Sequence, residues 1–232
     1  MRDKLTGPAV LRWGKRLLAY VAGMYLIAMG VVISARSSLG VSPVASLANV
    51  LYQICLSRNA PAWLTLGNLT TLTYCGYILA EFLLLRKDFK PSMLLQLIAS
   101  FIFGRLVDLA GRMLRFLPVP GSYPLQMLYL LCSIPLVAAG VMIYIAPKLI
   151  PMPAEGVSLA VSQKTGVVLG TAKVIFDCTV VSISAAVSLL YFHKLVGVRE
   201  GTVLCAVFVG ILMRQMMKVC QKPLLRFVER EE

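Results

Sequence analysis

Six long apolar stretches constrain the fold of this chain more than any other feature of its sequence. Each approaches the roughly 20 residues that a helix needs to cross the hydrocarbon core of a bilayer. They run over residues 17–34, 63–85, 92–111, 123–147, 168–192 and 201–218. Hydrocarbon offers the backbone no hydrogen-bond partners, and the turn pattern of paired barrel strands is missing, so each stretch should be a helix. The sequence therefore predicts an all-α polytopic membrane protein with six transmembrane helices.

Composition and charge argue against a soluble enzyme and against a nucleic-acid-binding protein. Of the 232 residues, 59% are hydrophobic and only 14% are charged, whereas soluble domains average about a quarter charged. With the N-terminus in the cytoplasm, fourteen of the 23 basic residues fall on the inner side, six on the outer side and three within the apolar stretches. This distribution follows the positive-inside rule. We therefore expect both termini in the cytoplasm, a lipid bilayer as partner, and no nucleic acid.

Similar landmarks recur at an offset of 103 to 110 residues, which indicates a duplicated half. The matched landmarks are Gly30-Val31-Val32-Ile33 before Pro43 with Gly140-Val141-Met142-Ile143 before Pro153, Leu66-Gly67 with Leu169-Gly170, and Ser100, Gly104 and Asp108 with Ala206, Gly210 and Arg214. Three spans per half is an odd number, so the second half should enter the membrane from the opposite side, as an inverted repeat. The expected divisions are a basic N-terminus (1–16), repeat one (17–111), an external connector (112–122), repeat two (123–218) and a charged tail (219–232).

The link between the first two spans of each half contains a short apolar segment that begins near a proline. Ser42-Pro43 precedes one segment and Pro153 begins the other. Proline near the first turn is a helix-start signal, and both segments are too short to span a bilayer. We expect two short helices, either re-entrant or lying on the membrane surface, whose N-terminal N–H groups could face a ligand.

Charged residues within the spans are costly unless they are paired or hydrated. Those in question are Arg105, Asp108, Lys173, Asp177 and Arg214. Lys173 and Asp177 are four residues apart, so they share a helix face and should point inward. Asp108 and Arg214 occupy equivalent repeat positions, and we expect a structural ion pair between them where the third spans of the two halves cross. Glu81, one turn before two basic residues, should reach the inner interface.

These features converge on one candidate site for a solute. Its expected binding residues are Ser42, Pro43, Glu155, Gly156, Lys173, Asp177, Arg199 and Glu200. Basic and acidic groups are nearly balanced within the spans, and two helix N-termini are added to them. This favours a small anionic or zwitterionic solute over a bare cation. The alternative interpretation is that these charges only hold the helices together.

Several motifs resemble one family of bacterial membrane proteins. They are Pro153-Ala154-Glu155-Gly156-Val157, Lys164-Thr165-Gly166, Gly197-Val198-Arg199-Glu200-Gly201-Thr202-Val203 and Leu39-Gly40 with Pro43. Together with Lys173 and Asp177 they look like the YczE/YyaS/YitT family of integral membrane proteins, over nearly the whole chain. The resemblance implies a bacterial inner-membrane protein of five or six spans with a duplicated half, and it implies no substrate.

A secondary-type transporter explains the repeat, the interrupted segments and the interior charges together. The chain has one histidine, His193, and no P-loop, GxSxG or HExxH motif, so we expect no enzyme, no metal site and no cofactor. Two alternatives stay open: a substrate-binding membrane subunit that needs an energising partner, and a non-transporting accessory membrane protein. A homodimer is also left open.

Overall fold

The computed structural model describes the backbone of residues 7–229 and the side chains of residues 13–220. The ends of the predicted N-terminus (1–16) and tail (219–232) lie outside the described residues. The described chain is entirely helical, with three short 3₁₀ turns between the α-helices. The α-helices are α1 (Gly7–Ser37), α2 (Pro43–Ser57), α3 (Leu66–Leu85), α4 (Leu95–Met113), α5 (Tyr123–Ile145), α6 (Pro153–Thr165), α7 (Leu169–Phe192) and α8 (Glu200–Glu229).

Six of these helices are long and apolar enough to cross a membrane, namely α1, α3, α4, α5, α7 and α8. They match the six predicted stretches to within a few residues at most ends, although α1 starts earlier and α8 runs well past its predicted end. The prediction of an all-helical integral membrane protein is therefore confirmed.

The two short helices form where the prolines predicted them. Pro43 and Pro153 each occupy the first turn of their helix, where a missing N–H costs no hydrogen bond. Gly166 ends α6 in the left-handed conformation, with φ of +72°, and its amide N–H donates to the Ser162 carbonyl. With 15 and 13 residues, α2 and α6 reach only about 20 Å at 1.5 Å per residue, short of the roughly 30 Å of hydrocarbon.

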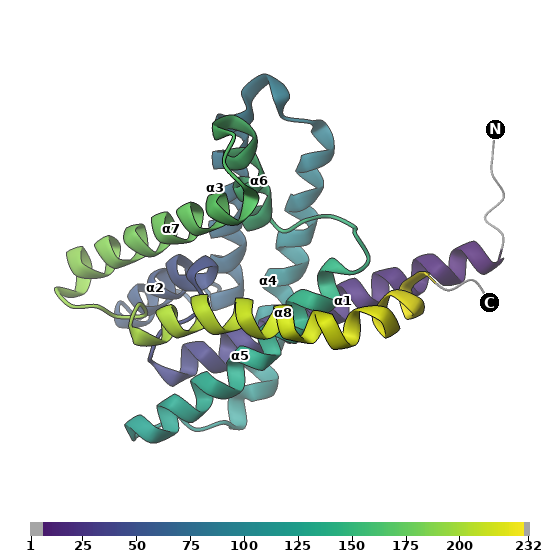
Figure 1. Cartoon of the computed structure of the whole chain (residues 1–232). Helices are drawn as coiled ribbons and strands as arrows, with labels where there is room; N and C mark the ends of the chain where they lie inside the picture. Colours follow the sequence, from purple (N-terminus) through teal and green to yellow (C-terminus); the bar gives the residue numbers. More distant parts are fainter. Residues whose placement is uncertain (1–6, 230–232) are drawn as a thin grey trace.

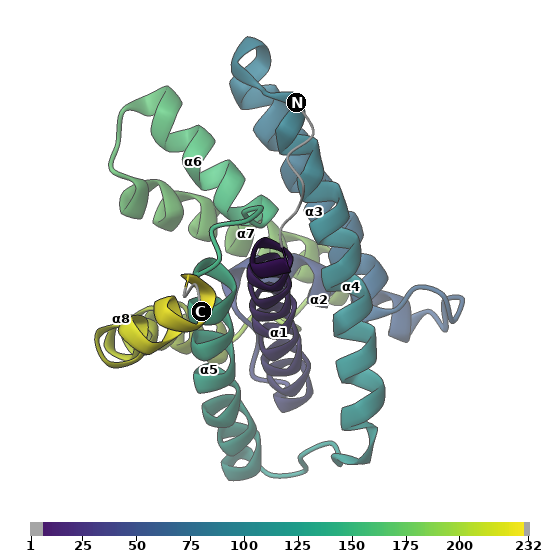
Figure 2. The same cartoon turned by 90° about the vertical axis from the view of Figure 1, so that its right-hand side faces the viewer.

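Helices α1 and α5 cross antiparallel at the centre of the molecule. Glycines allow this close approach, because a Cβ on Gly23 would lie 2.4 Å from the Tyr144 amide nitrogen and one on Gly140 would lie 2.7 Å from the Gly23 carbonyl oxygen. A second contact joins Gly30 to Ser133 further along the same crossing. In Figure 2, α1 and α5 lie side by side, with α4 packed on α1 and α8 packed on α5.

The predicted crossing of α4 with α8 is wrong, because the first spans cross instead of the third. The small residues of α4 face α3: a Cβ on Gly104 would meet Thr71 Oγ1 at 2.0 Å and the Gly67 carbonyl at 2.6 Å. Helix α6 packs on α3 and α7, and α2 packs on α7 and α3. In Figure 1, α3 and α4 stand upright while α1, α7 and α8 run across the view.

Side chains at the helix ends contact partners that were predicted on their own side of the membrane. On the predicted inner side, Lys164 pairs with Asp88 at 2.7 Å. On the predicted outer side, the Arg58 guanidinium donates to the Tyr191 hydroxyl at 2.7 Å, and Arg36 donates to the Leu117 carbonyl. Each of these contacts therefore joins segments that were predicted to lie on the same side.

Candidate functional site

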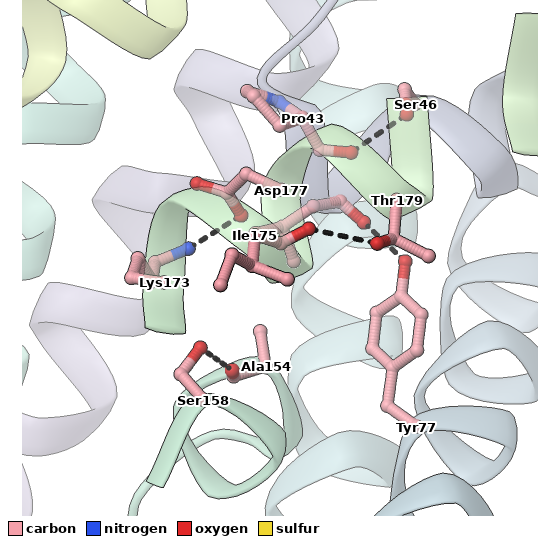
Figure 3. A network of polar contacts seen from close by, with 10 residues as sticks. Pro43, Ser46, Tyr77, Ala154, Ser158, Lys173, Ile175, Asp177 and Thr179 are labelled. Carbon is pink, nitrogen blue, oxygen red and sulfur yellow. Dashed lines mark hydrogen bonds and ion pairs between the residues drawn. The ribbon is translucent and has the colours of Figure 1, made fainter. Parts of the chain in front are cut away.

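Lys173 and Asp177 of α7 form an ion pair between the two short helices. The Nζ to Oδ1 distance is 2.7 Å, and the side chains are 37% and 24% exposed. Their spacing of one helical turn brings them to one face, as predicted. The Lys173 ammonium also lies 5.8 Å from the centre of the Phe176 ring, within the range of a cation–π contact. Figure 3 shows the pair between Pro43, at the start of α2, and Ala154, at the start of α6.

Glu155 is a buried carboxyl at the start of α6. It accepts a hydrogen bond from the Met152 amide N–H at 2.7 Å and another from the Tyr144 hydroxyl. The first bond is half of a capping box, in which an acidic residue at the third helical position satisfies the N-cap amide. Burial raises the pKa of Glu155, while the two donors and Lys173 act in the opposite direction. The N-terminus of α6 thus carries its own carboxylate.

The N-terminus of α2 differs, because no carboxylate of the described residues accepts a hydrogen bond from it. Ser42 makes no capping hydrogen bond with its side chain. The residue that corresponds to Glu155 at the repeat offset of 110 is Ala45. The Ser46 hydroxyl donates to the Pro43 carbonyl at 2.7 Å and lies 2.8 Å from the Ser184 hydroxyl of α7. The end of α2 is therefore fixed against α7 but keeps backbone donors that no side chain accepts from.

Tyrosines complete the surroundings of the charged groups. The Tyr77 hydroxyl of α3 (Figure 3) donates to the Val44 carbonyl at 3.0 Å. The Tyr77 ring also meets the Phe176 ring edge to face at 5.1 Å. The Tyr20 hydroxyl of α1 donates to the Ile150 carbonyl at 2.9 Å. No sequence pattern had marked these residues as part of the site. The sequence signal that could have found Tyr77 is its spacing of three residues from Tyr74 within an apolar stretch.

Gly156 lets α6 approach a second buried polar group. A Cβ at this position would lie 2.6 Å from Glu81 Oε2 and 2.9 Å from the amide of Gln96. The Gln96 amide donates to Glu81 at 3.0 Å, and both side chains are 2% exposed. The expectation that Glu81 reaches the membrane interface is therefore wrong, because Gln96 gives its carboxyl a partner inside the protein.

Arg199 and Glu200 lie away from the contacts just described, at the start of α8. They pair with each other at 3.0 Å, and the Arg199 guanidinium donates to the Ser38 carbonyl at 3.5 Å. Both side chains are 40% exposed. The structure thus joins these two predicted site residues to the loop between α1 and α2 rather than to Glu155 or Lys173.

Asp108 caps a neighbouring helix instead of pairing with Arg214. Its carboxylate accepts hydrogen bonds from the Gly67 amide and the Thr65 hydroxyl, both at 2.9 Å, and so covers the N-terminus of α3. Within the described residues it makes no ion pair with Arg214, which is exposed on α8. The expected ion pair does not form because α4 packs on α3 instead of crossing α8.

The groups gathered here are of the kind that can recognise charge. They are one ammonium, two carboxyls, tyrosine hydroxyls and the open end of α2. In the part of the chain that the structure describes, no group of three His, Cys, Asp or Glu side chains could hold a metal ion.

Comparisons with known proteins give a family but no function. No curated protein and no solved structure matches this chain. A model of a family of unknown function matches residues 14–218, which is most of the chain. The prediction of an uncharacterised family that covers nearly the whole sequence is thereby confirmed, whereas the likeness to the YczE/YyaS/YitT family stays a prediction. By this match, the chain belongs to the family of unknown function DUF6198.

Proposed function

We propose that this protein is a small secondary-type transporter of an anionic or zwitterionic solute in a bacterial inner membrane, with both termini in the cytoplasm. The solute site lies where the N-terminal ends of α2 and α6 approach Lys173 and Asp177. The observation that carries the proposal is the position of this ion pair, which is partly exposed between two short helices in a chain of apolar helices. Charges placed there are expensive unless they serve binding or structure.

Two contacts between α1 and α5 are equivalent when the halves are interchanged, and this supports an inverted repeat. At the repeat offset of 110, Gly23 corresponds to Ser133 and Gly30 to Gly140. The contact of Gly23 with Gly140 therefore maps onto that of Ser133 with Gly30, and both occur at the antiparallel crossing of α1 with α5. Exchange of this kind is what a two-fold axis through the crossing would produce, and an axis in the membrane plane is typical of secondary transporters.

The packing of the two short helices is also equivalent when the halves are interchanged. Helix α2 packs on α7 and α6 packs on α3, which are equivalent pairs in the two halves. Ser46 of α2 meets Ser184 of α7, and the residues at the equivalent positions are Gly156 and Glu81, which also meet. Both short helices thus enter between the halves in related ways, which supports a site at the repeat interface.

The charges at this interface favour a solute that carries a negative group. In the second half Glu155 caps α6, whereas the corresponding Ala45 leaves the end of α2 without a carboxylate. An anionic group of a solute would be stabilised by this helix end and by the Lys173 ammonium. A positive group on the same solute would find Asp177 one helical turn away.

A thermal-shift screen of the purified protein tests the proposal. The compounds are inorganic phosphate, small carboxylates and amino acids, each measured on the wild type and on Lys173→Ala. A ligand present at 100 times its Kd should add about 2.7 kcal/mol to the free energy of unfolding. We expect at least one compound to stabilise the wild type and to lose this effect in Lys173→Ala.

Lys164→Ala is the matched control, because Lys164 also pairs with an aspartate at 2.7 Å but lies outside the site. It should keep the full ligand effect. If no compound stabilises the wild type, or if Lys173→Ala responds like Lys164→Ala, the solute site is refuted.

A further inference from the structure

The third span of each half packs differently on the second span. In the first half α3 and α4 are in close contact, and a Cβ on Gly67 would lie 2.1 Å from the Gly104 carbonyl oxygen. The corresponding glycines of the second half are Gly170 of α7 and Gly210 of α8, and a Cβ on either would meet open space. Within the described residues, α7 and α8 are not a closely packed pair, and α2 contacts both. The second and third spans are thus packed together in the first half and separated in the second half.

The separation of α7 and α8 leaves the proposed site exposed. At the repeat offset of 103, Lys173 and Asp177 correspond to Thr70 and Tyr74 of α3. Thr70 and Tyr74 are 1% and 4% exposed, and the Tyr74 ring is stacked on Phe103 of α4 at 5.6 Å. The Lys173 and Asp177 side chains are 37% and 24% exposed. The position that α4 covers at Tyr74 is therefore partly exposed at its counterpart Asp177, which α8 does not cover.

The residues near the start of α3 and the start of α7 explain why α4 packs on α3 while α8 does not pack on α7. Asp108 of α4 accepts from the Gly67 amide at the start of α3. Its counterpart on α8 is Arg214, which has no acceptor for the equivalent amide of Gly170. The start of α7 also lacks a side-chain cap. A cation opposite the positive end of a helix gives no attraction between them.

We propose that α8 is a gate that closes on α7 and covers the Lys173–Asp177 pair, in the way that α4 covers the equivalent part of α3. In the closed state Gly210 faces Gly170 and Ala206 faces Val174, as Gly104 faces Gly67 and Ser100 faces Thr71 in the first half. The gate opens at the start of α7, close to Lys164 and therefore on the side predicted to be cytoplasmic. This inference rests on the proposed transport function, because alternating access needs a site that is covered in one state and open in the other.

Disulfide trapping tests the closure without any knowledge of the solute. In a background where the native cysteines are replaced by serine or alanine, Val174→Cys is combined with Ala206→Cys and the protein is oxidised in lipid vesicles. Val174 is 60% exposed and Ala206 is also exposed, so neither replacement disturbs a packed contact. A closed state populated at only about 0.1–10% would still accumulate as the disulfide forms. We expect an intrachain bond, identified from the linked peptides by mass spectrometry.

Two controls fix the geometry of the movement. Val174→Cys with Phe208→Cys places the second thiol on the opposite face of α8, and it should form far less intrachain bond. Gly210→Leu fills the space needed for closure and should abolish trapping of Val174→Cys with Ala206→Cys. Gly76→Leu is the matched variant, because Gly76 of α3 also has open space around its Cα, and it should leave trapping unchanged.

Three outcomes would overturn the gate. They are equal trapping in both cysteine pairs, trapping that survives Gly210→Leu, and a bond that forms only between two chains. The last would assign the open face of α7 to a second copy of the protein. Intrachain trapping without any ligand in the thermal-shift screen would instead refute the transporter and keep the movement, so the two proposals fail separately.

Discussion

Replacing Gly23 with alanine should destabilise the protein, although alanine is the better helix former. The helix propensity of alanine adds about 1 kcal/mol in favour of the variant. Against this, the new Cβ would lie 2.4 Å from the Tyr144 amide nitrogen and 2.8 Å from the Gly140 carbonyl oxygen. These are backbone atoms, so α1 and α5 must move apart along the central crossing, and overpacking of this kind costs about 1–3 kcal/mol. After the gain in propensity is subtracted, we expect a net loss of up to about 2 kcal/mol.

Thermal unfolding in detergent, followed by the fluorescence of Trp13 and Trp63, measures this loss. A change of 1 kcal/mol corresponds to about 2–4 °C in Tm for a chain of this size. Gly76→Ala is the control, because its Cβ meets no atom within 4 Å and should leave Tm unchanged or raise it. Gly140→Ala should behave like Gly23→Ala, since the contact is reciprocal. A Gly23→Ala protein as stable as Gly76→Ala would refute the close crossing of α1 and α5.

Three further predictions concern the charged groups. Asp108→Ala should lower the free energy of unfolding by about 1–2 kcal/mol because the Gly67 amide loses its acceptor, and Asp108→Asn, which keeps one acceptor, should lose about half as much in chemical unfolding. Burial raises the pKa of Glu155 above its ordinary 4.5, so its stabilising contribution is present at low pH and is lost as the pH rises through the folded-state pKa. The Tm of the wild type should therefore decline relative to that of Glu155→Gln as the pH is raised from 4.5. Parallel profiles of Tm against pH for the two proteins would contradict this. Asp177→Asn should remove thermal shifts caused by zwitterions but keep those caused by simple anions through Lys173, so equal loss of both would mean that the carboxylate does not contact the solute.

Local signals in the sequence predicted the elements of the fold. Apolar length gave the six long helices, because hydrocarbon leaves the backbone only internal hydrogen bonds. Pro43 and Pro153 predicted the starts of the two short helices, since proline tolerates the first turn and little else in a helix. The spacing of Lys173 and Asp177 predicted that they share a helix face, and their ion pair needs only that one turn of one helix. Each of these features depends on residues that are close together in the chain.

Which helices meet was decided only by the tertiary structure. The small residues of α4 and those of α1 look equally suited to a crossing, but Gly104 packs on α3 while Gly23 packs on α5. The partner of Asp108 proved to be the start of α3, and Glu81 found Gln96 inside the protein. Such pairings depend on which faces of several helices can be packed at the same time, and composition and spacing along one helix carry no information about the others. The sequence by itself therefore determined the helices and their charged residues, while long-range packing determined the partners that those residues have.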